Sequence, residues 1–320
     1  MMANLKELVK GKELFTGGHR ACAGCGAVIV ARQVLAVAGP NTVVANATGC
    51  LEVVSTIFPF TSWNVPFVHS AFENAAATIS GVEALYKSWV RQGKYNKKIN
   101  FIAFGGDGGT YDIGLQSLSG AVERGHNILY VCYNNEAYMN TGVQRSGATP
   151  RGADTTTAPA GKVKQGKEQF RKNLTEIMVA HGIPYVAQSV VGNWRDLTSK
   201  VEKALSMEGP KFINVFQPCR LGWSYKPEMT CEMGRIAADT CVWPLYEVVN
   251  GQYKITYRPK EKKNVSEWIN LQGRFRHLLK PANKQIMDDI QAQVDKFWEN
   301  LQKKDTGASQ SQQNPAAKAA

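Results

Sequence analysis

Two short polar segments contain the residue types of a magnesium site. One is the glycine-rich segment 105–109, GGDGG, which contains Asp107, and the other is the pair Asn134-Asn135. Mg²⁺ takes about six oxygen ligands, and it often combines one or two carboxylates with substrate phosphates and water. The glycines beside Asp107 also allow backbone amides to approach a diphosphate closely. These residues therefore indicate a metal–diphosphate site, provided that the fold brings positions 107 and 135 together.

The predicted strands and helix around these segments indicate that the fold brings positions 107 and 135 together. Residues 101–104 and 127–133 are short apolar runs typical of buried parallel strands. Residues 112–124 carry apolar side chains at helical spacing, and Gly125 ends that predicted helix. A strand, helix and strand of this length form a right-handed crossover, so the two strands are parallel and end side by side.

The rest of the chain alternates predicted helices and strands, which indicates an α/β fold with a doubly wound, mainly parallel sheet. Near the C-terminus, two alternating runs flank Asn250-Gly251, which predicts a β-hairpin. We expect helices over 27–37, 69–91, 165–181, 194–207 and 281–301, and strands over 42–47, 184–188 and 211–216. We divide the chain into an N-terminal arm (1–16), an α/β domain (17–219), a C-terminal extension with hairpin and helix (220–303) and a disordered tail (304–320).

Four of the seven cysteines occupy positions that suit metal binding. Cys22 and Cys25 form a C-x-x-C pair in a glycine-rich loop, while Cys50 and Cys219 each follow a predicted parallel strand. Because such strands end at one edge of the sheet, the four thiolates can hold either a zinc ion or a [4Fe–4S] cluster there. Their spacing does not choose between the two, and the isolated pattern alone favours structural zinc.

The remaining cysteines are weaker candidates. Cys132 lies inside a predicted buried strand and acts as a small apolar filler. Cys231 or Cys241 could replace Cys219 as the fourth ligand.

Composition narrows the function classes. The chain has 320 residues, 43% of them hydrophobic, and a formal net charge of +12. It has no 18-residue apolar run and no N-terminal segment typical of a signal peptide, so we expect a cytoplasmic protein without a membrane span. Its cationic residues are spread along the chain without a nucleic-acid-binding motif, so we expect no nucleic acid partner. The charge instead suits an acidic electron carrier or a phosphate-bearing cosubstrate.

Gly106-Asp107-Gly108, followed after 25 residues by Asn134-Asn135, resembles the thiamine diphosphate motif of thiamine-dependent enzymes. The longer segments GHRACAGCG, NATGCLEVVSTIFPFTSW, AFENAAATISG, GDGGTYDIGLQSLSGA, YNNEAYMNTGVQRSGATP and QPC resemble the β subunit of the pyruvate:ferredoxin oxidoreductase family. The resemblance covers roughly residues 17–223. A redox centre beside a thiamine cofactor could accept electrons from it, which favours the iron–sulfur cluster over zinc.

The resemblance implies the roles of individual residues. Cys22, Cys25, Cys50 and Cys219 would ligate one [4Fe–4S] cluster, whereas Asp107, Asn135 and the Ala137 carbonyl would hold Mg²⁺. The cofactor-binding set would be Cys50, Gly106, Asp107, Gly108, Gly109, Asn135, Ala137, Tyr138 and Asn140, with Asn140 as the catalytic residue near the reacting carbon.

The resemblance also implies partners. Thiamine enzymes use a glutamate from a separate pyrimidine-binding domain, and this chain has no second sheet to supply one, so we expect an α subunit to provide it. The chain lacks a bacterial ferredoxin cysteine run, so further clusters would come from γ and ferredoxin-like subunits or free ferredoxin. The expected reaction converts a 2-oxo acid, pyruvate first, and coenzyme A into acyl-CoA and CO₂.

Three other functions stay open at this point. The same chemistry could act on a branched-chain or aryl 2-oxo acid, such as 2-oxoisovalerate or phenylglyoxylate. Arg151 and Asp154 place charges in the loop after the thiamine motif, where a small apolar substrate suggests neutral residues. A non-oxidative thiamine-dependent decarboxylase subunit would need no cluster, and a zinc-stabilised assembly subunit would bind no thiamine diphosphate.

Overall fold

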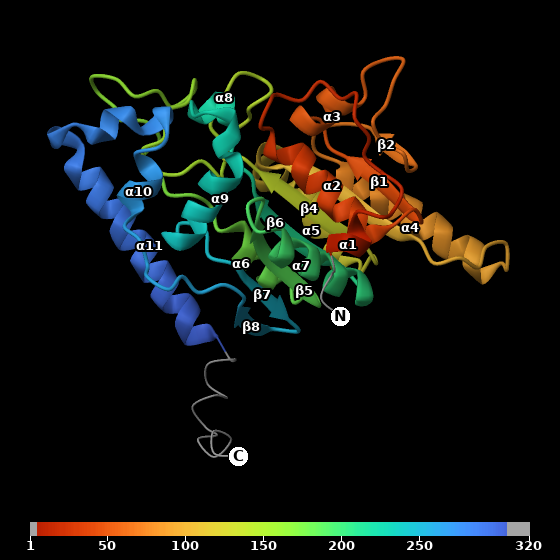
Figure 1. Cartoon of the computed structure of the whole chain (residues 1–320). Helices are drawn as coiled ribbons and strands as arrows, with labels where there is room; N and C mark the ends of the chain where they lie inside the picture. The colour runs from red at the N-terminus through yellow and green to blue at the C-terminus, as the bar shows by residue number, and fades with distance from the viewer. Residues whose placement is uncertain (1–4, 306–320) are drawn as a thin grey trace, which may run out of the picture.

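The computed structural model describes residues 5–305, and its centre is one eight-stranded sheet (Figure 1). The strand order is β2-β1-β3-β4-β6-β5-β7-β8. The six strands from β2 to β5 in this order are parallel, and β7 pairs antiparallel with both β5 and β8. The predicted α/β fold with a mainly parallel sheet is therefore confirmed. The strands are β1 (Thr42–Asn46), β2 (Phe67–His69), β3 (Asn100–Gly106), β4 (Leu129–Asn134), β5 (Tyr185–Val190), β6 (Lys211–Phe216), β7 (Tyr246–Val249) and β8 (Gln252–Ile255).

Helices cover both faces of the sheet because successive strand side chains point to opposite sides. In β4, Val131 and Tyr133 pack into the core under α2 and α7, whereas Tyr130 and Cys132 pack into the core under α4, α5 and α6. The helices of these two layers are α2 (Gly26–Ala38), α4 (Ala75–Arg91), α5 (Leu115–Glu123), α6 (Leu174–Ala180) and α7 (Trp194–Ser206).

The C-terminal region packs against the same sheet. The hairpin of β7 and β8 extends the sheet at one edge, and α11 buries Trp298 and Leu301 in the core under α4, α5 and α6. A third core, containing Trp223, Trp243 and Trp268, joins α8, α9 and α10 to β6. The domain boundaries stay predictions. The remaining elements are α1 (Leu5–Leu8), α3 (Cys50–Ser55), α8 (Arg220–Trp223), η2 (Pro227–Met229), α9 (Thr230–Asp239), α10 (Val265–Ile269), η3 (Gly273–Leu279), η4 (Pro281–Asn283) and α11 (Lys284–Lys304).

The helix predicted after β3 begins earlier than its apolar spacing suggested. The π-helical turn η1 (Gly108–Ile113) precedes α5, so Gly108 and Gly109 belong to a helical turn rather than to an open loop. The amide of Gly114 donates to the Gly109 carbonyl at 2.8 Å, and a Cβ at position 114 would lie 2.2 Å from that oxygen. A glycine at position 114 therefore permits this tight turn.

Two other predicted helices are shorter than expected. His69 is the last residue of β2, and residues 70–74 precede α4, where the Asn74 side chain accepts the Ala71 amide at 3.0 Å. Residues 165–173 precede α6, whose first turn is capped by the Asn173 side chain. The predicted tail over 304–320 lies outside the described residues from position 306 onward. Along residues 5–305, no helix is long and apolar enough to cross a membrane.

Candidate cofactor and metal site

The two polar segments meet at the carboxyl edge of the sheet, as predicted. Strand β3 pairs with β4 so that Gly106 lies opposite Tyr133, and Asp107 and Asn135 follow just beyond the paired ends of the two strands. The Asn135 amide donates to Asp107 Oδ1 at 3.1 Å. A cavity of about 30 Å³ opens at this point. Every residue of the predicted cofactor-binding set lines it: Cys50, Gly106, Asp107, Gly108, Gly109, Asn135, Ala137, Tyr138 and Asn140.

Three oxygen atoms converge in this site with no hydrogen-bond donor between them. The side-chain oxygen of Asn135 faces Asp107 Oδ1 at 3.0 Å and the Ala137 carbonyl oxygen at 2.8 Å. Hydrogen bonding alone would favour turning the amide over, so that its nitrogen donated to both oxygens. In an octahedral Mg²⁺ shell with bonds of about 2.0–2.1 Å, however, adjacent ligand oxygens lie about 2.9 Å apart. With the Asn135 oxygen turned inward, its separations from Asp107 and from Ala137 therefore match those between adjacent ligands of a Mg²⁺ shell.

The Asp107 carboxylate is shielded from water and suited to a bound cation. Its side chain is buried, and Oδ2 accepts a hydrogen bond from Ser146 Oγ at 2.5 Å. Burial raises the pKa of Asp107 to about 7, and the Glu136 carboxylate adds to the increase. A divalent cation beside this carboxylate would reverse that effect and favour its ionised form.

Glu136, between the two proposed ligand positions, adopts an unusual backbone conformation. Its φ of +65° lies in the left-handed region, which costs a residue other than glycine on the order of 1–2 kcal/mol. Its amide donates to Asn134 Oδ1 at 2.9 Å, and its carbonyl accepts Thr149 Oγ1 at 2.6 Å. This reversal of the chain turns the Asn135 side chain and the Ala137 carbonyl toward the same point.

Two arginines hold the Glu136 carboxylate in place. Arg171 Nη2 lies 2.8 Å from Oε1, and Arg274 Nη2 lies 2.6 Å from Oε2. Arg274 is buried, its guanidinium lies 3.7 Å from the Trp223 ring centre, and Trp223 Nε1 donates to the Asn135 carbonyl at 2.9 Å. The C-terminal region thus supports the loop that carries the candidate metal ligands. We call Glu136, Arg171 and Arg274 the arginine clamp.

Sequence reasoning missed the clamp. The one sequence feature that could have drawn attention to Glu136 is its position as a charged residue between the candidate metal ligands Asn135 and Ala137. Nothing in the spacing pointed to Arg274, which lies 138 residues from Glu136 along the chain.

The four candidate cysteines gather at the edge of the sheet that carries this site. Cys25 precedes α2, Cys50 begins α3 and Cys219 precedes α8, and Figure 1 shows α3 and α8 at the same edge. Burial raises the pKa of Cys50 to about 12, and Cys219, Cys25 and Cys22 add to the increase. Burial likewise raises the pKa of Cys25, with smaller contributions from Cys219 and Cys22. The four sulfurs therefore lie within electrostatic range of one another.

Among residues 5–305, no three Cys, His, Asp or Glu side chains lie close enough to hold one metal ion. A tetrahedral zinc site with Zn–S bonds of about 2.3 Å requires sulfurs about 4 Å apart. A [4Fe–4S] cluster is larger than a single ion, so its cysteine sulfurs lie farther apart than those of a zinc site.

The other candidates occupy different surroundings. Cys132 is fully buried within β4, as predicted, and Cys241 lines a different cavity. The Tyr138 ring closes over the glycine turn, and its hydroxyl donates to the Gly108 carbonyl at 3.0 Å. Asn140 is exposed at the mouth of the cavity.

The two charged side chains in the following loop both have partners within the chain. Arg151 pairs with Asp289 at 2.8 Å, and the Asp154 carboxylate accepts the Ala160 amide at 2.9 Å. Neither residue lines the candidate cofactor cavity.

Comparison with known proteins defines the class first. Residues 47–215 match the family model of the thiamine pyrophosphate enzyme C-terminal TPP-binding domain. That segment begins beside β1 and ends within β6, and it contains the crossover and the candidate metal site. A solved 2-oxoglutarate:ferredoxin oxidoreductase from Magnetococcus marinus has the same fold, with a TM-score of 0.53 over 63% of this chain and 64% of that chain, at 22% identity.

More similar proteins define the family within this class. The chain is 59% identical to pyruvate synthase subunit PorB of Methanocaldococcus jannaschii, over 83% of this chain and 90% of that protein. It is 52% identical to pyruvate synthase subunit PorB of Thermotoga maritima, over 94% of this chain and 96% of that protein. This chain belongs to the β-subunit family of the thiamine-dependent pyruvate:ferredoxin oxidoreductases. The resemblance found in the sequence motifs is therefore confirmed.

The Asp107→Ala variant tests the metal assignment. It removes the one carboxylate among the three converging oxygens, and we expect it to abolish Mg²⁺-dependent binding of thiamine diphosphate. Calorimetric titration with the cofactor, with and without Mg²⁺, measures the loss. The exposed Asp288→Ala variant is the control. Unchanged cofactor affinity in Asp107→Ala would refute the assignment.

The Arg274→Met variant tests whether the arginine clamp positions the metal ligands. Removing one partner of a buried ion pair costs about 3–5 kcal/mol of stability, which urea denaturation measures. We also expect at least a tenfold weaker Mg²⁺-dependent affinity for thiamine diphosphate, measured at a temperature where the variant stays folded. Arg258→Met, which removes a half-exposed pair with Asp305, is the control. A destabilised variant with unchanged Mg²⁺ dependence would leave the clamp a purely structural role.

Proposed function

We propose that this subunit binds thiamine diphosphate through a Mg²⁺ ion held by Asp107, Asn135 and the Ala137 carbonyl. The observation that carries the proposal is that the side-chain amide of Asn135 meets Asp107 Oδ1 at 3.0 Å and the Ala137 carbonyl oxygen at 2.8 Å beside a glycine turn. The backbone of residues 106–109 would face the diphosphate. Since the cavity measures about 30 Å³, the Tyr138 ring that now covers Gly108 must move aside when the cofactor binds.

The proposed reaction is the oxidative decarboxylation of a 2-oxo acid to acyl-CoA and CO₂, with pyruvate as the first candidate. The names of the two relatives support this choice of substrate. Bound thiamine diphosphate supplies the nucleophilic carbon for this chemistry. Asn140, exposed at the cavity mouth, would contact the reacting end of the cofactor.

We further propose that Cys22, Cys25, Cys50 and Cys219 hold one [4Fe–4S] cluster, which would carry electrons away one at a time. Cys50 supports this arrangement, because it lines the cofactor cavity and also lies within electrostatic range of the other three cysteines. One side chain would thus lie next to both cofactors.

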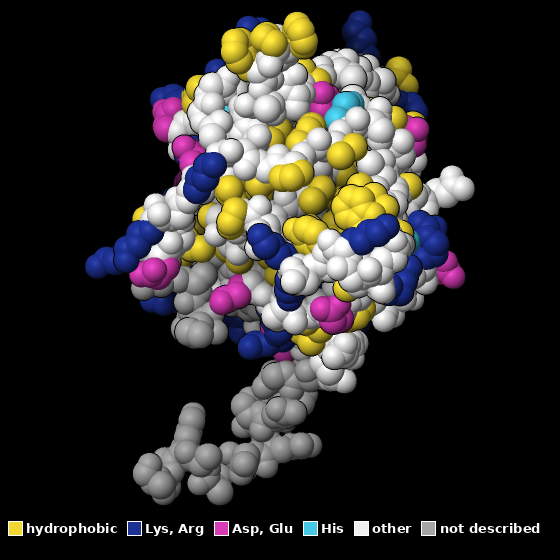
Figure 2. All heavy atoms as spheres, turned by 90° about the vertical axis from the view of Figure 1, so that its right-hand side faces the viewer, with side chains coloured by type: hydrophobic (Ala, Val, Ile, Leu, Met, Phe, Trp, Pro, Cys, Tyr) yellow, Lys and Arg dark blue, Asp and Glu magenta, His cyan; other side chains and the backbone are white. Residues whose placement is uncertain are grey.

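A separate α subunit would complete the active site by supplying the activating glutamate. The cofactor cavity is bordered by Cys50 of α3 and by Phe72, which follows β2. Between these two residues in the sequence, Phe58 is 94% exposed and Phe60 is 77% exposed, and Val53 and Val68 are also exposed. Figure 2 faces this side of the molecule and shows hydrophobic side chains at its top and in several patches across its centre. Apolar exposure of this kind marks protein interfaces.

The assembled enzyme tests the proposed reaction. We would purify the chain with its partner subunits without oxygen and supply coenzyme A with pyruvate, 2-oxoisovalerate or phenylglyoxylate. Pyruvate-dependent reduction of ferredoxin, with acetyl-CoA formed in equal amount to CO₂, is the expected result. Faster turnover of 2-oxoisovalerate or phenylglyoxylate would support the alternative substrates. CO₂ release without electron transfer would indicate a non-oxidative decarboxylase.

The Cys219→Ser variant tests the cluster ligands. We expect it to lose or convert the cluster, seen as lower iron content and an altered low-temperature EPR signal after dithionite reduction. Cys132→Ser is the matched control, because that sulfur lies inside β4 and would not reach the cluster. Loss of iron from Cys132→Ser but not from Cys219→Ser would mean that the fourth ligand is wrong. Zinc in place of iron in the unmodified chain would overturn the redox assignment.

The Phe58→Asp variant tests the proposed docking face. Placing a charge at the centre of an apolar contact should weaken association with the α subunit at least tenfold. Co-purification from cells that produce both subunits, followed by sedimentation analysis, measures the change. Leu279→Asp, which alters an exposed leucine in η3, is the control. Equal association of both variants would place the interface elsewhere.

A further inference from the structure

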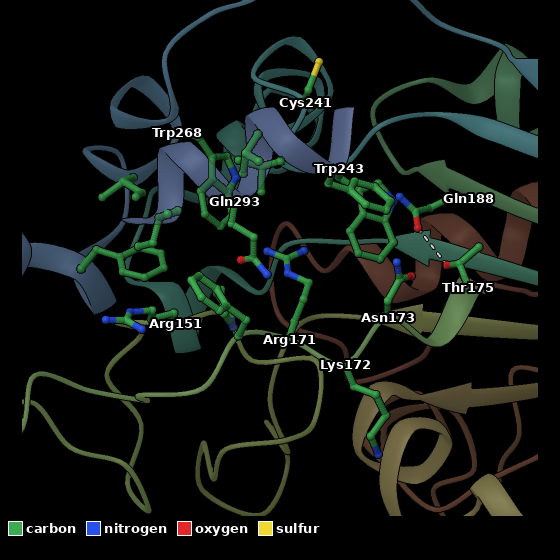
Figure 3. Close-up of a pocket in the computed structure, with 18 of the residues that line it drawn as sticks. Arg151, Arg171, Lys172, Asn173, Thr175, Gln188, Cys241, Trp243, Trp268 and Gln293 are labelled. Atoms are coloured by element: carbon green, nitrogen blue, oxygen red, sulfur yellow. Dashed lines mark hydrogen bonds between the residues drawn. The ribbon is translucent and has the colours of Figure 1, made fainter. Parts of the chain in front are cut away.

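A second cavity, of about 110 Å³, lies between α10, α11 and the long loop after β4 (Figure 3). None of the residues proposed above for cofactor or cluster binding lines it. Much of its wall is apolar and aromatic, and the buried parts of that wall form one of the hydrophobic cores. The residues of this wall are Trp243, Trp268, Phe275, Ile290, Val294 and Phe297.

The charged side chains of the cavity all have the same sign. Arg151, Arg171 and Lys172 line it, and its described lining includes no Asp or Glu. The carboxylates that pair with these cations, Asp289, Glu136 and Asp112, lie outside the lining. Figure 3 shows Arg171 pointing from its loop into the cavity. A ligand there would therefore meet a positive electrostatic potential.

Arg171 is the cation best placed to bind a ligand. Its side chain remains 20% exposed although it contacts Glu136, and its Nη1 has no hydrogen-bond partner within residues 5–305. Glu136 is shared with Arg274, so the arginine clamp contains two buried or half-buried positive charges and one negative charge. An anion at the exposed part of Arg171 would balance the net positive charge of the clamp.

We propose that this cavity binds a small monocarboxylate with a short apolar chain. The carboxylate pairs with Arg171, and the chain lies against the wall formed by Trp243 and Trp268. The volume limits the ligand, because a cavity of about 150 Å³ is enough to hold benzene. For this smaller cavity, about six non-hydrogen atoms, including the carboxylate, is therefore the upper limit.

Isobutyrate is the probe for this proposal, and the neutral isostere isobutyramide is its control. Calorimetric titration of each into the full-length chain at low ionic strength measures affinity and stoichiometry. We expect one isobutyrate per chain and at least tenfold weaker binding of isobutyramide, as a charge-assisted hydrogen bond requires. Saturation-transfer NMR should show contact between the isobutyrate methyl groups and aromatic protons.

Two variants locate the site. Arg171→Gln should weaken isobutyrate binding at least tenfold, whereas Arg235→Gln, which alters an exposed arginine of α9, should not change it. Val294→Phe should abolish binding by filling the cavity while leaving the arginine clamp intact, and circular dichroism checks that each variant folds. Equal binding of isobutyrate and isobutyramide, binding that survives Val294→Phe, or no saturable binding would each overturn the proposal.

Discussion

The ion pairs between buried Glu136 and two arginines are the constraint on which the candidate active site depends. Glu136 takes a left-handed backbone conformation that is unfavourable for its residue type. Such a conformation persists because Arg171 and Arg274 fix the side chain and Thr149 fixes the carbonyl. With the backbone so held, the residues on either side of Glu136 present their oxygens toward Asp107. A buried salt bridge here provides geometry rather than net stability.

The clamp also explains why the C-terminal region belongs with the cofactor domain. Arg274 lies in η3, far along the chain from the thiamine motif, yet it is stacked on Trp223 and bonded to Glu136. The same tryptophan donates to the Asn135 carbonyl. Strands β7 and β8 extend the sheet itself, and α11 covers part of one face. Structural support for the site therefore comes from both halves of the chain.

The sequence predicted the site where local patterns and general topology were sufficient. Two apolar strands joined by a helix have one common arrangement, so the meeting of Asp107 and Asn135 followed from their positions at the strand ends. The starts of α4 and α6 were predicted too early, because they depend on side-chain contacts that helical spacing does not reveal: Asn74 accepts the upstream Ala71 amide, and Asn173 caps α6. The pairing of Glu136 with Arg274 could not be predicted from the sequence, because no short-range pattern connects residues so far apart in the chain.

The charges around the site bear on how Mg²⁺ and thiamine diphosphate would bind. Asp107 is the one carboxylate among the three proposed ligands, and the neighbouring Glu136 carboxylate is paired with two arginines. A divalent ion at this point would meet one negative ligand and, behind it, a net positive clamp. Such a site attracts bare Mg²⁺ weakly, whereas the negative diphosphate supplies both the missing ligands and the missing charge. The arrangement therefore favours joint binding of metal and diphosphate, and the clamp that orients the ligands also limits what the metal site can bind alone.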